Sequence, residues 1–265
     1  MRPRKSLGQN FLMDAGAAMR IAKAAVEGSP QGEPFRVLEI GPGTGALTQA
    51  LLTLGANVTA LDVDAKMIEI LRSREELHGA HILEADALTF DYEDFARHGP
   101  WRATGNLPYN IATPLMMRLI EMQNGPEQVV IMIQKDVAAR LSAKPSTPAY
   151  GSLSLAVQYG MAVQRLFTLG PGVFYPRPKV ESAVVRLTRH AQPPVAVRDV
   201  HFFMQVVRGG FAYRRKTLPN SLQLALGIPR AQIQQTLALI DIDPEIRGEQ
   251  LTLAEFARLS DNLKP

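Results

Sequence analysis

Residues 35–45 read Phe-Arg-Val-Leu-Glu-Ile-Gly-Pro-Gly-Thr-Gly, and this stretch decides the fold. Its first half is a short, largely apolar run typical of a buried strand, and residues 46–54 have the apolar spacing of a helix. Glycines between a strand and a helix let a ligand approach the backbone and the helix N-terminus. Gly41, Gly43 and Ala46 fit a spacing that suits both nicotinamide cofactors and S-adenosylmethionine. The turn therefore predicts a nucleotide-containing cofactor without choosing between the two.

The same alternation of strand and helix continues on both sides of this turn. Further strands are predicted at residues 57–61, 80–83, 102–104 and 128–133, and helices at residues 15–26, 65–72, 114–122 and 134–141. Asp14 is the expected N-cap of the first helix. Strands and helices that alternate in this way form a parallel sheet with helices on both faces. We therefore expect a Rossmann-like α/β fold.

The pattern changes in the last third of the chain. Residues 163–169 and 182–188 are expected to be two longer strands that pair antiparallel at the sheet edge. Residues 190–195 contain two prolines and form the best candidate for a linker, and only helical periods follow, at residues 202–211, 218–226, 231–239 and 253–263. We predict a cofactor-binding domain over residues 1–190 and a small helical domain over residues 191–265.

Composition excludes several classes of protein. The 265 residues include no cysteine, which rules out disulfide frameworks, thiolate metal sites and cysteine nucleophiles. The five histidines show no metal-ligand spacing, and we expect no metal. Polar residues interrupt the longest uncharged stretch, and the N-terminus lacks the apolar core of a signal peptide, so we expect a cytoplasmic protein without a membrane span. No self-pairing heptad is visible, and a monomer is expected.

Acidic residues follow the second and third strands of the alternation. Asp62 ends the strand at 57–61, about 20 residues after the first glycine, where a carboxylate accepts hydrogen bonds from ribose hydroxyls. Asp86 follows the next strand, where an acidic side chain either holds the exocyclic amine of an adenine ring or simply caps a helix or loop. Because ligands bind at the carboxyl ends of parallel strands, both residues are candidates for the cofactor site.

The motif Asn106-Leu107-Pro108-Tyr109 follows the fourth strand and favours methyl transfer. Hydrogen bonds from an adenine N6 amine to the Asn106 side-chain oxygen and the Leu107 carbonyl would make that nitrogen more nucleophilic. Tyr109 would hold the base by stacking. Asparagine cannot act as a general base, so the expected mechanism is positioning, with the proton leaving after transfer.

With these motifs in place, the chain resembles the small-subunit ribosomal RNA dimethyladenosine transferases over its whole length. The resemblance rests on the motif around Asn106 and on four further segments: residues 8–12 (Gly-Gln-Asn-Phe-Leu), 39–43 (Glu-Ile-Gly-Pro-Gly), 174–180 (Phe-x-Pro-x-Pro-Lys-Val) and 214–222, which contain Arg-Arg-Lys-Thr and Asn-Ser-Leu. The fold that this resemblance implies is a class I S-adenosylmethionine-dependent methyltransferase domain followed by a small all-helical domain.

The resemblance also implies a substrate and a set of site residues. The acceptor would be two adjacent adenosines in the hairpin loop near the 3′ end of 16S rRNA, each dimethylated at N6 in the immature small subunit. Phe174 would join Tyr109 in sandwiching the looped-out base. The implied contacts to S-adenosylmethionine fall on Asn10, Leu12, Gly41, Asp62, Asp86 and Asn106, with Gly43 in the same glycine turn.

Two positions depart from the family pattern. The family usually has Glu where this chain has Asp62, and we expect the shorter carboxylate to keep ribose binding through a shifted backbone or a bridging water. Thr44 stands where the family commonly has an apolar residue, which leaves the reaction class unchanged.

Basic residues suggest where RNA phosphates bind. The net charge is +4, and six cations are candidates for an electrostatic track: Arg177, Lys179, Arg208, Arg214, Arg215 and Lys216. The alternative is that these residues only form a solvated charged surface and bind no RNA.

Three other functions remain open at this point. The first is a related adenine N6 methyltransferase that modifies large-subunit rRNA. The second is a nicotinamide-dependent oxidoreductase, which gives the Asn106 motif no role. The third is a non-catalytic RNA-binding or assembly factor, whose RNA binding would not depend on Asn106.

Overall fold

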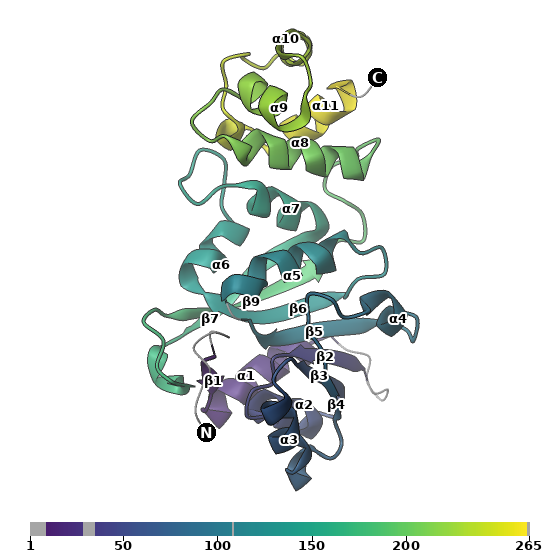
Figure 1. Ribbon diagram of the computed structural model, residues 1–265, viewed down its shortest axis with the longest axis vertical. Coiled ribbons are helices and arrows are strands. Elements are labelled where there is room, and N and C mark those ends of the chain that lie inside the picture. Colours follow the sequence, from purple (N-terminus) through teal and green to yellow (C-terminus); the bar gives the residue numbers. More distant parts are fainter. Residues whose placement is uncertain (1–8, 29–34, 108, 264–265) are drawn as a thin grey trace. The chain divides into compact units, whose positions relative to one another are not determined.

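The computed structural model of the protein describes residues 9–28, 35–107 and 109–263, apart from the side chains of residues 109 and 110. The chain divides into two compact units (Figure 1). Unit 1 comprises Met1–Ala138 and Ala162–Arg189, and unit 2 comprises Ala139–Met161 and His190–Pro265. Our limits of 1–190 and 191–265 stay a prediction, and they did not anticipate that residues 139–161 group with the C-terminal helices.

Unit 1 is built on a seven-stranded sheet in the order β4-β3-β2-β5-β6-β9-β7. Strands β2 to β6 run parallel, and β9 lies antiparallel to β6. The strands are β2 (Arg36–Ile40), β3 (Asn57–Asp62), β4 (His81–Glu84), β5 (Trp101–Asn106), β6 (Gln128–Gln134), β7 (Met161–Leu169) and β9 (Ser182–Arg189). The chain adds β3 and β4 on one side of β2 and then crosses to β5 on the other side. This reversal places the ligand crevice of such sheets between β2 and β5.

Helices cover both faces of this sheet (Figure 1). Helices α1, α2 and α3 lie on one face and α5 on the other. The helices of the alternating region are α1 (Ala15–Val26), α2 (Ala46–Thr53), α3 (Ala65–Arg72), α4 (Tyr92–Ala96), α5 (Tyr109–Glu121) and α6 (Lys135–Leu141). The predicted α/β architecture is confirmed, as is the Asp14 cap of α1, whose side chain accepts from the Ala17 N–H at 2.6 Å.

Side chains from three neighbouring strands bind the C-terminal end of α1. Arg102 Nη1 donates to the carbonyls of Ala25 and Glu27, both at 2.9 Å. Gln128 Nε2 donates to the carbonyls of Ala24 and Ala25, at 3.0 and 3.1 Å, and Arg186 donates to Ala24 and to the Glu27 carboxylate. Carbonyls at a helix end lack partners within the helix. These bonds therefore fix α1 to β5, β6 and β9.

Helix α5 is longer than expected. We placed it at residues 114–122, whereas the helix begins at Tyr109 and includes Pro114. Proline inside a helix removes one backbone hydrogen bond. The buried side chains of Ala112, Leu115 and Met116 on its inner face offset that loss.

A second, two-stranded antiparallel sheet lies beside the main one in unit 1. Strand β1 (Phe11–Leu12) pairs with β8 (Phe174–Tyr175), and the sequence analysis identified neither. Two-residue strands carry no periodicity of their own. This pairing joins the N-terminal segment to the loop that precedes β9.

Unit 2 is helical. Its helices are α7 (Ser152–Gly160), α8 (Val200–Ala212), α9 (Leu218–Leu226), α10 (Arg230–Leu239) and α11 (Leu253–Leu263). Phe211 stacks on Phe256 and meets the edge of Tyr150, whose hydroxyl donates to the Leu251 carbonyl at 2.8 Å. This aromatic core ties residues 139–161 to the C-terminal helices. In the part of the chain that the structure describes, no helix is long and apolar enough to cross a bilayer.

Candidate functional site

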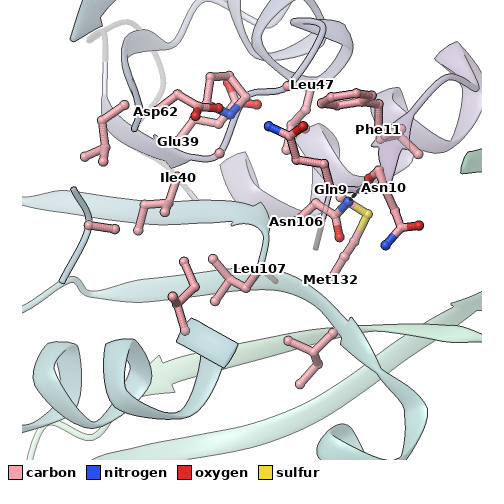
Figure 2. Close-up of a pocket in the computed structure, with 18 of the residues that line it drawn as sticks. Gln9, Asn10, Phe11, Glu39, Ile40, Leu47, Asp62, Asn106, Leu107 and Met132 are labelled. Carbon is pink, nitrogen blue, oxygen red and sulfur yellow. Dashed lines mark hydrogen bonds between the residues drawn. The ribbon is translucent and has the colours of Figure 1, made fainter. Parts of the chain in front are cut away.

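A cavity of about 690 Å³ opens at the carboxyl ends of β2, β3 and β5 (Figure 2). This volume is typical of small-molecule sites. Of the sequence-predicted site residues, the cavity wall includes Asn10, Leu12, Gly41, Gly43, Asp62, Asp86, Asn106, Leu107 and Phe174. The carboxyl end of the sheet thus brings together residues that lie up to 164 positions apart, from Asn10 to Phe174.

The glycine-rich turn forms one wall of this cavity. Gly41, Gly43 and Gly45 have φ values of +70°, +56° and +86°, a region that favours glycine. A Cβ atom at Gly43 would come within 2.9 Å of Phe11 Cδ1. The backbone of the turn can therefore approach both a ligand and the N-terminal segment closely, and helix α2 begins directly after it.

Asp62 lies at the end of β3 with its side chain in the cavity wall. Burial raises the pKa of the Asp62 carboxyl, while hydrogen bonds from the backbone N–H groups of Asp64, at 2.9 Å, and Gly43 oppose the rise. The same contacts orient the carboxylate. A carboxylate held in this way can accept hydrogen bonds from two ribose hydroxyls. The Asp62 side chain reaches the cavity although it is shorter than the expected glutamate.

Glu39 is a cavity residue to which the sequence analysis gave no role. It is 1% exposed, and Thr48 Oγ1 donates to its carboxylate at 2.6 Å. Burial raises the pKa of Glu39 to about 7, the Thr48 hydrogen bond opposes this rise, and the nearby charge of Asp62 adds to it. Its place at the end of a buried strand, directly before the glycine turn, was the available signal. No sequence pattern indicates that Thr48 faces it.

The N-terminal segment closes the cavity from another side. The Asn106 side chain donates from Nδ2 to the Asn10 carbonyl at 2.6 Å (Figure 2). Gln9 Nε2 donates to Asp64 Oδ2 at 3.3 Å, and Phe11 packs on Gly43. The predicted proximity of Asn10 and Leu12 to the cofactor pocket came from the family resemblance alone. Phe11 and Gln9 belong to the segment that carries the resemblance, but neither was given a role, because nothing in their spacing shows which residues they contact.

The remaining acceptor-site residues differ in their surroundings. Leu107 is buried, and its N–H donates to the Met132 carbonyl at 3.1 Å. Phe174 is 4% exposed, lines the cavity and belongs to the core that includes Leu12. Asp86 is exposed at the cavity and accepts from the Leu88 N–H at 2.8 Å. The Tyr109 side chain lies outside the described part of the structure.

The six basic candidates lie in both units. Arg177 and Lys179 are exposed in the loop after β8 of unit 1. Arg208, Arg214, Arg215 and Lys216 are exposed in unit 2, at and beyond the end of α8. Arg214 also forms an ion pair with Glu249 Oε2 at 3.2 Å, so it has a structural contact within its own unit.

Metal ligands do not cluster in the described residues. Across 9–28, 35–107 and 109–263, no three His, Cys, Asp or Glu side chains come together as a metal site requires.

Comparison with known proteins gives a consistent result across the whole chain. A family model described as "Ribosomal RNA adenine dimethylase" matches residues 1–264. A relative from Hahella chejuensis named "Ribosomal RNA small subunit methyltransferase A" is 45% identical over 260 residues, which is 97% of this chain and 92% of the relative.

Two solved structures share the fold. A dimethyladenosine transferase from Plasmodium falciparum superposes with a TM-score of 0.73 at 26% identity, covering 94% of this chain and 95% of the other. The 23S rRNA methyltransferase ErmE gives a TM-score of 0.69 at 25% identity, with 97% and 100% covered. The expected class I methyltransferase fold with a C-terminal helical region is thereby confirmed.

Proposed function

The chain belongs to the ribosomal RNA adenine dimethylase family, and from this premise we propose how its own residues carry out the reaction. It is an S-adenosylmethionine-dependent rRNA adenine dimethyltransferase of the kind that acts on 16S rRNA of the small subunit. The acceptor we assign is a pair of adjacent adenosines in the 3′-terminal hairpin loop, each dimethylated at N6. The observation that carries the proposal is the Asn106 side chain, held by the Asn10 carbonyl at the cavity beside the glycine turn.

The residues of the cavity fit S-adenosylmethionine. Gly41 and Gly43 leave the turn without side chains, so the methionine portion can lie against the backbone. The Asp62 carboxylate suits the ribose hydroxyls, and Asp86 suits the adenine amine. Asn10 and Leu12 close the pocket from the N-terminal side. When bound, S-adenosylmethionine supplies an electrophilic methyl group on a sulfonium sulfur.

Asn106 and Leu107 position the acceptor nitrogen. Because Nδ2 of Asn106 is committed to the Asn10 carbonyl, Oδ1 is the end of the amide that accepts a hydrogen bond from adenine N6. The Leu107 carbonyl accepts the other N6–H. Hydrogen bonds from the amine to these two acceptors favour a pyramidal N6. Its lone pair is then less delocalised into the ring and points at the methyl group. The N6 proton leaves to solvent after transfer, since neither group is a base.

Aromatic side chains hold the acceptor base. We assign Phe174 to one face of the looped-out adenine and Tyr109 to the other, as unstacked bases are held in RNA complexes. Phe174 is supported by its place on the cavity wall, and Tyr109 by its place in the motif directly after Leu107.

The same premise extends to partners and location. We assign the immature small subunit as the partner, with phosphate contacts from the exposed basic residues Arg177, Lys179, Arg208, Arg214, Arg215 and Lys216. The proposed form is a cytoplasmic monomer that acts during small-subunit assembly.

A direct test is transfer of labelled methyl groups from S-adenosylmethionine to immature small subunits that lack the modification. Wild type should yield dimethyladenosine in 16S rRNA, and Asn106→Ala should lose roughly a hundredfold or more in rate at saturating S-adenosylmethionine. Leu239→Ala, an exposed position on α10, is the control. Modification of 23S rRNA instead would show that the substrate is the large subunit. Binding of subunits without methyl transfer would show that the protein is an assembly factor.

A further inference from the structure

The β1–β8 pair carries an exposed apolar face next to the cavity. Phe11 and Tyr175 are directly opposed in the antiparallel register, so their side chains share one face of the pair. Met13 follows Phe11 by two residues, and its N–H continues the pairing to the Val173 carbonyl at 2.8 Å. Residues two apart in an extended segment point to the same side. Met13 and Tyr175, which we call the rim pair, therefore flank Phe11.

Exposure changes sharply along this face. Phe11 is 5% exposed, packs on Gly43 and lines the cavity, whereas Met13 and Tyr175 are each 56% exposed. The chain on both sides of Tyr175 returns to the cavity, since Phe174 and Pro178 line it. The rim pair thus lies where the cavity meets solvent.

The surroundings of Tyr175 are cationic. Arg177 and Lys179 are both exposed and follow it at alternate positions. The nearest acidic residue in the same loop, Glu181, is paired with Lys135 at 2.8 Å. An exposed aromatic ring next to two cations suits a nucleotide, whose base has a π face and whose phosphate is anionic.

The size of the rim pair also favours a nucleotide over a protein. A stable protein interface buries about 800 Å² on each partner, far more than two side chains provide. One base covers one aromatic ring. In a single-stranded segment, the nucleotide next to the one in the cavity lies outside it, and Tyr175 is exposed between the cavity-lining residues Phe174 and Pro178.

We propose that Tyr175 is a stacking platform for the base adjacent to the adenosine held in the cavity. The inference rests on the proposed function for its RNA substrate, and it adds a residue that reads the neighbouring nucleotide. Stacking needs the ring and not the hydroxyl, so Tyr175→Phe should behave as wild type. Because two adjacent adenosines are modified, the platform would hold one while the other reacts.

The test measures affinity of the protein, loaded with S-adenosylhomocysteine, for immature small subunits. Tyr175→Ala should bind roughly tenfold to a hundredfold more weakly, while Tyr175→Phe and the surface control Leu239→Ala keep wild-type affinity. Affinity for S-adenosylhomocysteine should be the same in all four proteins. In methyl transfer, Tyr175→Ala should raise KM for subunits with little change in kcat.

Several results would overturn the platform. Equal affinity of Tyr175→Ala and wild type rules it out, and an equal loss in Tyr175→Phe assigns the effect to the hydroxyl. A loss of S-adenosylhomocysteine affinity or of thermal stability in Tyr175→Ala makes the role structural. Wild type that binds subunits without methylating them contradicts the proposed function, while the affinity series still decides the platform. Wild type that binds no subunits contradicts both.

Discussion

The Asn106 side chain donates from Nδ2 to the backbone carbonyl of Asn10, 96 positions away, at 2.6 Å. This bond joins the motif after β5 to the N-terminal segment and decides which way the amide points. An asparagine free to rotate would present a donor or an acceptor to the substrate. Here the acceptor is selected, which is the group that an amine nucleophile needs.

Replacing Asn106 by Asp tests this selection. An ionised carboxylate has two acceptors and no donor, so it would repel the Asn10 carbonyl instead of binding it. We expect Asn106→Asp to lower kcat by roughly a hundredfold, as Asn106→Ala does, although it keeps an oxygen for the substrate. Rapid-quench methyl transfer measures this. An Asp variant close to wild type would show that the link to Asn10 does not matter.

Gly43→Ala should weaken cofactor binding through Phe11. The new Cβ would lie 2.9 Å from Phe11 Cδ1 at a residue with φ of +56°, so the N-terminal segment must shift. Overpacking of this kind typically costs about 1–3 kcal/mol, which corresponds to a loss of roughly fivefold to a hundredfold in affinity if it falls on the bound state. Calorimetric titration with S-adenosylhomocysteine gives the loss.

Gly55→Ala is the matched control for that variant. Gly55 has φ of +79° and no atom within 4 Å of its would-be Cβ, so it shares the backbone cost without the contact. It should lower the melting temperature and leave cofactor affinity unchanged. Similar affinity losses in both variants would assign the effect to backbone strain.

Gln9→Ala should loosen the N-terminal segment at its contact with Asp64. One side-chain hydrogen bond contributes about 1 kcal/mol, so we expect roughly a fivefold loss of affinity for S-adenosylhomocysteine at unchanged melting temperature. The exposed Gln205→Ala in α8 serves as control. No change in Gln9→Ala would mean that the segment is held by its other contacts alone.

Glu39 should make folding stability depend on pH. Its carboxyl has a pKa of about 7 in the folded protein against 4.5 when unperturbed. The folded state therefore keeps a proton that the unfolded state releases, and stability falls as pH rises from 4.5 to 7. The loss between pH 5 and 8 should be on the order of 2 to 3 kcal/mol.

Denaturant unfolding at several pH values measures this dependence. Glu39→Gln has no titrating group and should flatten the curve over that window. Parallel curves for wild type and variant would show that Glu39 does not hold its proton in the folded state.

The basic residues of unit 2 predict salt dependence of RNA binding. Removing two phosphate contacts in Arg215→Ala/Lys216→Ala should reduce the slope of log affinity against log salt by roughly 0.7 for each contact. Arg214→Ala should also lower thermal stability, because it breaks the ion pair with Glu249. An unchanged slope in the double variant would exclude both residues from the RNA track.

The fold was largely predictable because its signals are local. Asp14 caps α1 as its position before an apolar run indicates, and the alternating strands form the expected parallel sheet. The position of Asp62 in the cavity wall was also predictable, since it stands at the end of a strand. Residues 142–161 were not assigned, because α7 is recognised by its packing against distant helices and not by a pattern of its own.

The site was less predictable because it depends on contacts between distant segments. The burial of Glu39 depends on Thr48 and on the strands beside it, which periodicity does not reveal. Phe11 packs against Gly43 only because β1 pairs with β8. Family resemblance supplied Asn10 and Leu12, and only the structure supplied the direction of the Asn106 amide.

The bonds that fix the C-terminal end of α1 to β5, β6 and β9 also limit the movement of residues 9–13, which cover the cavity. Because α1 starts at Ala15 and is attached to the sheet, residues 9–13 are held both by a very short connection to an anchored helix and by the β1–β8 pair. A short tether keeps the effective concentration of Asn10 near Asn106 high, and closing so small a loop costs little chain entropy. The short connection therefore favours the closed arrangement, in which the Asn10 carbonyl meets the Asn106 side chain.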